Sequence, residues 1–182
     1  MNLKFKKLQT KNFLLDRVTI EDVKEILDLR SDPVVLTHLL RDPMQSEEEA
    51  GEFIRNLDKM IDDQSGFNWA IREAPGSELM GTIGFYNIKK SHYRLEIGYT
   101  LRAKFHRKGI MSECIIAVIQ YAFNEMKAHS IAAEIGPKNK ASRRLLEKTG
   151  FRLEAHFTED YYYNGEFSDS QIFSLLQKWF IV

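Results

Sequence analysis

The chain has 182 residues, of which 43% are hydrophobic and 12% aromatic, which is enough apolar material to bury the core of one folded domain. Lysine and arginine together number 26, as do aspartate and glutamate, so the formal net charge is zero. This balance argues against DNA, RNA or a membrane surface as the partner, and any site for an anion must be local.

The chain shows no internal repeat and no linker, so we expect a single domain over residues 1–182. Its basic N-terminal sequence lacks the apolar stretch of a secretory signal, and no apolar run approaches the ~20 residues that a membrane span needs. The single cysteine, Cys114, lies in an apolar helical run, where we expect a buried packing role. These features predict a cytoplasmic protein.

The N-terminal part predicts a strand followed by helices. Residues 13–19 read as a short strand, and Thr19 would cap a helix whose apolar positions, beginning at Ile20, have helical spacing. Pro33 interrupts this helix, because the residue before a proline avoids the helical conformation.

A second helix is predicted over residues 46–62, where Ser46 and Glu49 form a capping box. Its apolar residues fall on one stripe, which we expect to face the core. They are Phe53, Ile54, Leu57, Met60 and Ile61.

Strands then dominate the pattern. Residues 67–73 and 79–88 flank the turn sequence APGS and predict a hairpin, and residues 93–101 alternate as a third strand. A helix over 109–126, a strand over 130–136 and a helix over 139–150 follow.

The last two predicted strands, residues 151–163 and 166–179, are joined by Asn164-Gly165, a strong signal for a type I′ hairpin turn. The whole order of elements predicts a mixed α/β domain in which antiparallel pairs flank a central parallel βαβ unit.

The segment AKFHRKGIMSECIIAVIQYAF, residues 103–123, changes from basic to apolar at Gly109. The first turn of a helix has unpaired N–H groups that suit a phosphate, glycine lets the backbone approach it, and Arg107 and Lys108 add donors. The apolar positions behind Gly109 predict a buried helix that would hold this end firmly: Ile110, Met111, Cys114, Ile115, Val118, Ile119, Ala122, Phe123 and Met126. The same stretch also fits a plain basic loop that turns at a glycine.

The position of this loop favours a ligand site. It joins the end of the strand EIGYTL to the start of a helix, the edge at which α/β sheets usually bind ligands. A second strand-to-helix connection follows, with Asn139 three residues before Ser142.

Four phrases, LEIGYTL, FHRKGIMSE, NKASRRLLEKTGF and YYYNGEFSDSQIFSLL, make the sequence resemble the GNAT superfamily of acyl-CoA-dependent N-acetyltransferases. It is most similar to the branch that includes the Rim-type acetyltransferases of ribosomal-protein N-terminal alanine or serine. The resemblance covers essentially the whole chain. It implies the acyl-CoA N-acyltransferase fold: a mixed, mostly antiparallel sheet of about seven strands, with a splayed parallel pair at its centre and helices on both faces.

The resemblance also implies acetyl-CoA as cosubstrate, with its pyrophosphate on the loop amides. The matching positions are His106, Arg107, Lys108, Gly109, Ile110 and Met111. His106 replaces the family's Gln or Arg, and Met111 replaces a small residue that leaves more room for the cofactor. We expect no metal, because no second His or Cys stands at ligand spacing from His106.

In the family, the preceding strand holds the pantetheine arm and the acetyl carbonyl through its backbone. The matching residues are Ile97, Gly98, Tyr99, Thr100 and Leu101. Backbone amides near Tyr99 are the candidate donors to the oxyanion of a tetrahedral intermediate.

Glu96 is the candidate base that removes a proton from the substrate ammonium, directly or through water. It could equally be a strand glutamate in a surface ion pair.

Many family members carry on this helix a tyrosine that donates a proton to the thiolate, and Leu145 and Leu146 stand in that region here. In the Rim-type branch a serine three residues after the Asn can take that role, and the resemblance therefore implies Ser142 as the candidate acid. Asn139 would bond the amide arm of the cofactor. The alternatives are a plain helix cap for Asn139 and a first-turn residue for Ser142.

The acceptor is the open question. Tyr161, Tyr162 and Tyr163 could border its groove or pack as ordinary strand aromatics, and the acidic helix near residue 48 could favour a cation. The acceptor could be a protein N-terminus, or a small amine such as a polyamine or aminoglycoside. A non-catalytic acyl-CoA-binding module is a further alternative, and the terminal WFIV is a candidate homodimer contact.

Overall fold

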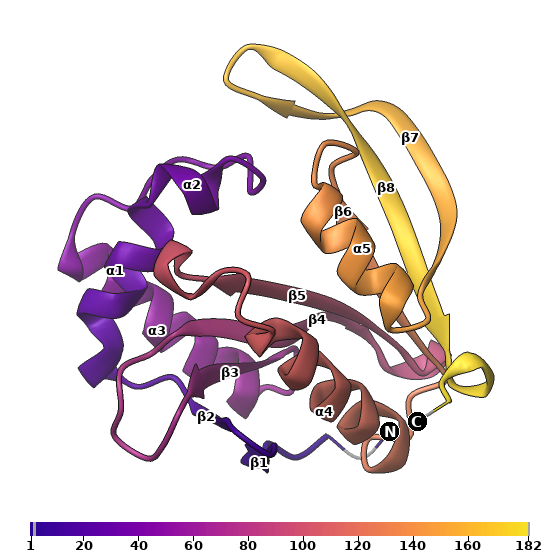
Figure 1. Cartoon of the computed structure of the whole chain (residues 1–182), viewed down its shortest axis with the longest axis horizontal. Coiled ribbons are helices and arrows are strands. Elements are labelled where there is room, and N and C mark those ends of the chain that lie inside the picture. Colours follow the sequence, from indigo (N-terminus) through magenta and orange to yellow (C-terminus); the bar gives the residue numbers. More distant parts are fainter. Residues whose placement is uncertain (2, 182) are drawn as a thin grey trace.

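The computed structural model describes residue 1 and residues 3–181, which form one eight-stranded sheet with helices on both faces (Figure 1). The strand order is β1-β2-β3-β4-β5-β6-β8-β7. The strands are β1 (Leu8–Gln9), β2 (Leu14–Arg17), β3 (Phe67–Arg72), β4 (Gly81–Lys89), β5 (Arg94–Leu101), β6 (Ser130–Ile135), β7 (Arg152–Tyr163) and β8 (Glu166–Leu176). The predicted fold class is confirmed. The short N-terminal strand β1 brings the number of strands to eight instead of about seven.

Five α-helices lie between the strands: α1 (Val23–Ser31), α2 (Pro33–Leu36), α3 (Glu47–Asp62), α4 (Ile110–Asn124) and α5 (Lys140–Lys148). The described residues also contain four 3-10 turns: η1 (Ile20–Asp22), η2 (Lys90–His92), η3 (Ala103–Phe105) and η4 (Gln177–Trp179). Helices α1 and α3 pack with Val18, Ala70 and Leu79 on one face of the sheet. Helices α4 and α5 pack on the other face.

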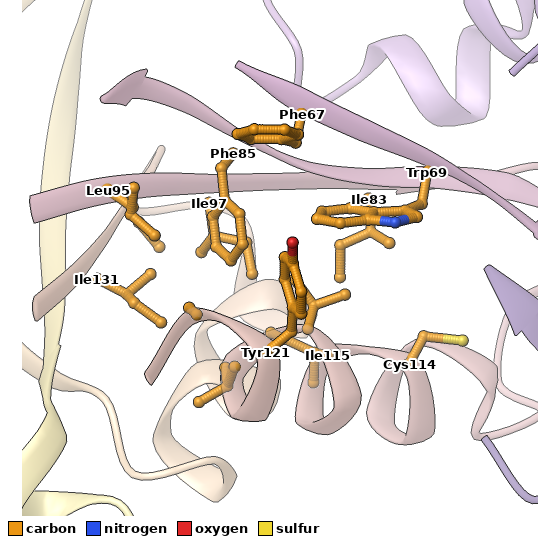
Figure 2. Packing of buried hydrophobic residues seen from close by; sticks show 14 of the residues in the cluster. Phe67, Trp69, Ile83, Phe85, Leu95, Ile97, Cys114, Ile115, Tyr121 and Ile131 are labelled. Atoms are coloured by element: carbon orange, nitrogen blue, oxygen red, sulfur yellow. The ribbon is translucent and has the colours of Figure 1, made fainter. Parts of the chain in front are cut away.

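The larger core lies between the sheet and α4, and Figure 2 shows Tyr121 of this helix reaching toward Phe85 and Trp69. The Trp69 ring meets both Tyr121 and Phe85 edge-on, with centroids 5.8 Å and 5.9 Å apart. All the apolar positions predicted behind Gly109, Cys114 among them, are buried. Burial raises the pKa of the Cys114 thiol to about 12, which suits packing and not nucleophilic chemistry.

The local signals in the sequence describe the real ends of several elements. The Ser46 hydroxyl accepts the Glu49 N–H at 3.2 Å at the start of α3, and α1 ends at Ser31, just before the proline. Asn164 and Gly165 both have positive φ, 50° and 87°, as a type I′ turn requires. Ile20 departs from prediction: it lies in η1 and is exposed instead of facing the core.

The central strands β5 and β6 are parallel but separate early. Residues Arg94–Glu96 pair with Ser130–Ala132, and the pairing stops there, although β5 continues along β4 to Leu101. β6 continues along β8 to Ile135. The sheet is therefore open between the second halves of β5 and β6.

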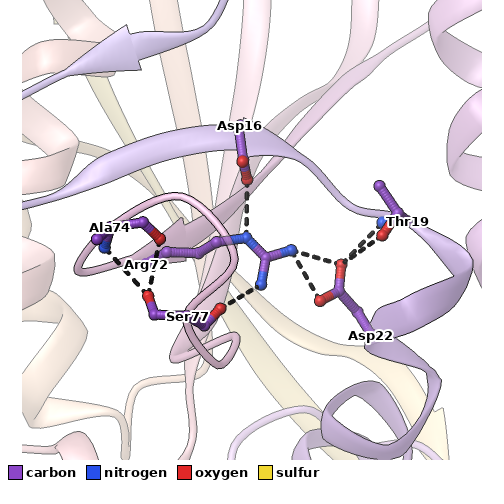
Figure 3. Close-up of polar contacts among 6 residues, drawn as sticks. All are labelled: Asp16, Thr19, Asp22, Arg72, Ala74 and Ser77. Carbon is purple, nitrogen blue, oxygen red and sulfur yellow. Dashed lines mark hydrogen bonds and ion pairs between the residues drawn. The ribbon is translucent and has the colours of Figure 1, made fainter.

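A buried ion network ties β2 and η1 to β3 (Figure 3). The Arg72 guanidinium donates to Asp22 at 2.6 Å and 2.7 Å, to Asp16 at 2.9 Å and to the Ser77 carbonyl at 2.9 Å. Burial alone would lower the pKa of Arg72, but the hydrogen bonds and charges of Asp22 and Asp16 outweigh it and raise that pKa. No helix in this part of the chain, residues 1 and 3–181, is long and apolar enough to span a bilayer.

Candidate active site

The loop before α4 is bent by two residues in the left-handed conformation. Arg107 has φ 61° and Gly109 has φ 77°. The first is uncommon for a residue with a side chain, and the second is a position where glycine is strongly preferred. A Cβ added at Gly109 would meet no atom within 4 Å, so the space in front of this turn is open.

The first turn of α4 keeps its backbone donors free. Gly109 has no side chain to cap the helix, and the first internal bond runs from the Glu113 N–H to the Gly109 carbonyl at 3.2 Å. Among the described residues, no side chain accepts from the N–H groups of residues 110–112. The Glu113 carboxylate is turned away and accepts from the backbone and side chain of Asn12, each at 2.8 Å. This helix end is thus a ready site for an anion.

The free edge of β5 lies beside this loop. The Ser130 N–H donates to the Tyr93 carbonyl on the β6 side, and the Arg102 N–H donates to the Met80 carbonyl on the β4 side. Since backbone direction alternates along a strand, Tyr99 directs its N–H and C=O toward the gap between β5 and β6. The Leu101 carbonyl faces the same way and accepts from His106 Nε2 at 2.8 Å. His106 therefore links the end of β5 to the loop.

A cavity of about 380 Å³ connects these features. Most predicted cofactor residues line it, namely Tyr99, Thr100, Leu101, His106, Arg107, Lys108, Gly109, Ile110, Met111, Asn139 and Ser142. Ile97 and Gly98 do not line it: the Ile97 side chain is in the core, and Gly98 lies against the Tyr86 ring on the opposite face. Met111 forms part of the cavity wall while its side chain is largely buried in the core.

Other lining residues were not found from the sequence: Val34, Val35, His38, Leu39, Phe105, Ser112, Ala141 and Leu145. The first four come from α2 and the loop after it, and no local pattern connects them with a helix that begins seventy residues later. Only tertiary packing brings them to the cavity.

Asn139 and Ser142 stand together at the start of α5. Asn139 Oδ1 accepts the Ser142 N–H at 3.0 Å, so Asn139 is the helix cap. The same residue lines the cavity. Its Nδ2 group donates to no described residue, which leaves a free donor there. Asn139 as a helix cap is therefore compatible with Asn139 as a donor to the amide arm of the cofactor.

The Tyr99 side chain points into the same region from β5. Its hydroxyl is buried and has no hydrogen-bond partner within residues 1 and 3–181. Burial raises the pKa of Tyr99 to about 12, and the nearby Ser142 side chain opposes this only in part. The hydroxyl therefore stays protonated at neutral pH.

Glu96 lies on the other face of the sheet, away from Ser142. Its carboxylate accepts from Asn87 Nδ2 at 2.8 Å and forms no ion pair with a described residue, so the surface ion pair considered for it is absent from that part of the chain. With Tyr86, it lines an open depression of about 700 Å³. Burial raises the pKa of neighbouring Glu134, and the charges of Glu96 and Asp160 add to this effect.

The β7–β8 hairpin reaches the loop after α2. The Tyr161 hydroxyl donates to the Leu40 carbonyl at 3.3 Å, and the Tyr163 hydroxyl bonds to Asp42 at 3.1 Å. These two bonds join the end of the hairpin to the loop after α2.

At the C-terminus, the Arg152 guanidinium stacks on the Trp179 ring at 4.1 Å, and the Phe180 ring packs 5.6 Å from that of Phe123. Ile181 is exposed. Val182, the last residue of the predicted dimer contact, lies outside the described residues.

Known proteins share this sequence and architecture. An N-acetyltransferase of Bacillus subtilis, YoaA, is 32% identical over 170 residues, covering 93% of this chain and 96% of its own. The ribosomal-protein uS5-alanine N-acetyltransferase of Escherichia coli is 29% identical over 61% of this chain and 58% of its own. The spermidine N(1)-acetyltransferase of Vibrio cholerae is 23% identical over 86% of this chain and 88% of its own.

Among solved structures, a GNAT-family acetyltransferase from Bacillus anthracis superposes with a TM-score of 0.83 at 26% identity, covering 95% of this chain and 99% of that one. The acetyltransferase (GNAT) domain profile matches residues 12–152, which include the loop before α4, the free edge of β5 and the cap of α5. The chain therefore belongs to the GNAT family of acetyl-CoA-dependent N-acetyltransferases.

Proposed function

We propose that this enzyme acetylates a primary amine at the N-terminus of a protein, with the acetyl-CoA diphosphate on the first turn of α4. The observation that carries the proposal is the uncapped start of α4, with open space in front of Gly109, leading to the free edge of β5. Arg107 and Lys108 add positive charge and pair with no described acid.

Acetyl-CoA supplies the acetyl group as a thioester, and transfer to an amine yields an N-acetyl product and the CoA thiol. The Tyr99 N–H, on the strand edge that faces the opening, is the donor placed to stabilise negative charge on the acetyl oxygen. The Asn139 Nδ2 group is free to bond the amide arm of the cofactor.

Two side chains on opposite faces of the sheet suit the two proton movements. Glu96 lies on the face covered by α1 and α3, and would accept a proton from the incoming ammonium. Ser142 lies on the face covered by α5, and would supply a proton to the leaving sulfur. The gap between β5 and β6 lets acceptor and thioester approach from different sides.

A small cationic amine is the second candidate acceptor, and a specific observation favours it. Burial raises the pKa of Glu134, and the negative charges of Glu96 and Asp160 add to this effect. A bound cation would relieve this repulsion.

The test is thiol release from acetyl-CoA with N-terminal alanine and serine peptides, spermidine and an aminoglycoside, beside calorimetry with acetyl-CoA. We expect acetyl-CoA binding and the highest kcat/KM with a peptide. Binding without thiol release for any amine would instead identify a non-catalytic acyl-CoA-binding module. Absence of binding would remove both proposals.

Ser142→Ala tests the assigned acid. General acid catalysis contributes roughly 10²–10⁴-fold, so we expect kcat to fall by at least about 10²-fold while acetyl-CoA affinity is little changed. Ser112→Ala, on the same cavity but in α4, is the matched control and should retain most of the activity. Unchanged kcat in Ser142→Ala would contradict the role of this serine.

A further inference from the structure

Arg30, near the end of α1, carries a positive charge that no described residue neutralises. Its guanidinium stacks on the Phe53 ring of α3, with Cζ 4.1 Å from the ring centroid. It is partly buried and forms no ion pair or side-chain hydrogen bond within residues 1 and 3–181. Burial lowers the pKa of Arg30 to about 10, and the nearby Arg41 acts in the same direction. Arg30 stays charged at neutral pH, and an anion bound beside it would compensate the partial burial of that charge.

The backbone around Arg41 is held through its two neighbours in the chain, Leu40 and Asp42. The Leu40 carbonyl and the Asp42 carboxylate are bonded by Tyr161 and Tyr163 of the β7–β8 hairpin. The loop that carries Arg41 is therefore fastened to the β7–β8 hairpin. Because Tyr163 bonds Asp42, the adjacent carboxylate already has a partner of its own.

Both arginines lie near Tyr86, and the Arg30 carbonyl accepts the Met44 N–H, from the loop that carries Arg41, at 3.0 Å. Burial raises the pKa of the Tyr86 hydroxyl, while the charges of Arg30 and Arg41 lower it, so both guanidinium groups lie within electrostatic reach of this hydroxyl. The Tyr86 ring covers Gly98 of β5, where an added Cβ would come within 3.0 Å of the ring. Gly98 directly precedes Tyr99, whose backbone faces the gap. Tyr86 thus connects the arginines with the reacting centre.

Asn68 adds an unused polar atom beside Tyr86. Its Nδ2 donates to the Tyr86 hydroxyl at 2.5 Å, while its Oδ1 is buried without a partner among the described residues. The Asn68 residue is only 2% exposed. A buried polar atom left unpaired is unfavourable in the free protein, and it points to a ligand that brings polar groups.

Glu96 adds a negative charge beside Tyr86. It lines the same depression as Tyr86 and forms no ion pair with a described residue, so it can meet an ammonium while the arginines meet an anion. A polyamine or an aminoglycoside, which carries only positive charge, would be attracted by Glu96 and repelled by the two arginines.

We propose that Arg30 and Arg41 form an anion subsite, and that the natural acceptor therefore carries a carboxylate close to its reactive amine. Two sources share this chemistry: a peptide N-terminus followed by an acidic residue, and a free amino acid. This inference rests on the proposed acetyl transfer and narrows its acceptor class.

Matched acceptors that differ only in charge provide the test. Peptides beginning Ala-Asp and Ser-Glu are compared with Ala-Asn and Ser-Gln, and free amino acids with their amides. We expect the carboxylate member of a pair to have a kcat/KM at least about 10-fold higher, as a charge-assisted contact would give. The peptide and amino-acid arms distinguish the two sources. Equal rates within every pair, or a preference for spermidine, would overturn the subsite.

Variants of Arg30 test whether this residue causes the preference for the carboxylate acceptor. Arg30→Gln should remove most of the preference within a pair, and Arg30→Glu should shift it toward the uncharged or cationic acceptor. Arg17→Gln is the control: this arginine pairs with Asp58 at 2.7 Å, away from the site, and its loss should leave the preference unchanged. Unaltered acetyl-CoA binding and melting temperature verify that the Arg30 variants are folded.

A second readout separates this inference from the proposed function. If the wild-type enzyme acetylates none of these amines, the proposed acetyl transfer to them is contradicted. Binding at the anion subsite can still be measured by calorimetry with CoA present. N-acetylated acidic peptides should then bind at least about 10-fold more tightly than their amide counterparts, and Arg30→Gln should abolish the difference. Equal affinities would reject the anion subsite whatever the enzyme acetylates.

Discussion

Gly109 is held at φ 77°, a conformation that other residues adopt only with strain, and a Cβ there would project into open space. We expect Gly109→Ala to lose about 1–2 kcal/mol of folding free energy from backbone strain. It should also weaken acetyl-CoA binding, because the methyl group occupies the space that a diphosphate would use to approach the amides of α4. Chemical denaturation and calorimetry measure the two effects.

Gly76 is the matched control for this residue. It has φ 74°, and an added Cβ would also meet nothing within 4 Å, but it lies in the turn between β3 and β4. Gly76→Ala should therefore lose a similar amount of stability and bind acetyl-CoA normally. If Gly109→Ala also bound acetyl-CoA normally, the anion would not lie against this turn.

Among the elements, α5 shows how one residue can serve both a helix and a ligand. Asn139 Oδ1 caps the helix, and Nδ2 remains free beside the cavity. Asn139→Asp keeps the acceptor oxygen and places a negative charge at a helix start, so stability should be retained. The loss of the donor and the added charge should weaken acetyl-CoA binding.

Asn139→Ala should reduce both properties, with a stability loss of about 0.5–2 kcal/mol. Ser46→Ala, which removes the cap of α3, should lose similar stability while leaving acetyl-CoA binding unchanged. Normal acetyl-CoA binding by Asn139→Asp would show that Asn139 is only a cap.

At the scale of the whole molecule, Arg72 at the end of β3 holds β2 and η1 in place through Asp16 and Asp22. Its side chain and that of Asp22 are 7% and 6% exposed. Arg72→Met would leave two carboxylates without a counter-charge, and loss of one partner of a buried pair costs about 3–5 kcal/mol. Urea denaturation should show a loss of this size, and the further changes Asp16→Asn and Asp22→Asn should recover part of it. A loss below about 1 kcal/mol would mean that water replaces the arginine.

Local sequence predicted those parts of the site that depend on a short segment. The change from basic to apolar residues at Gly109 predicted a buried helix with an exposed start, and the spacing of Asn139 and Ser142 placed a capped helix beside it. These two helix predictions succeeded because capping and helical periodicity involve residues within a few positions of each other. The resemblance to the GNAT family supplied the remaining cofactor residues, of which Ile97 and Gly98 lie outside the cavity.

The sequence by itself determined the order of most strands and helices, the buried face of α4 and the glycine start of that helix, because these follow from side-chain periodicity and backbone chemistry along one segment. Only the tertiary structure decided where β5 and β6 separate, that Glu96 and Ser142 stand on opposite faces, that α2 lines the cavity in front of α4, and that the loop after α2 meets the β7–β8 hairpin. Those contacts join residues far apart in the chain. Their positions depend on how two cores and a twisted sheet pack together, which no local pattern records.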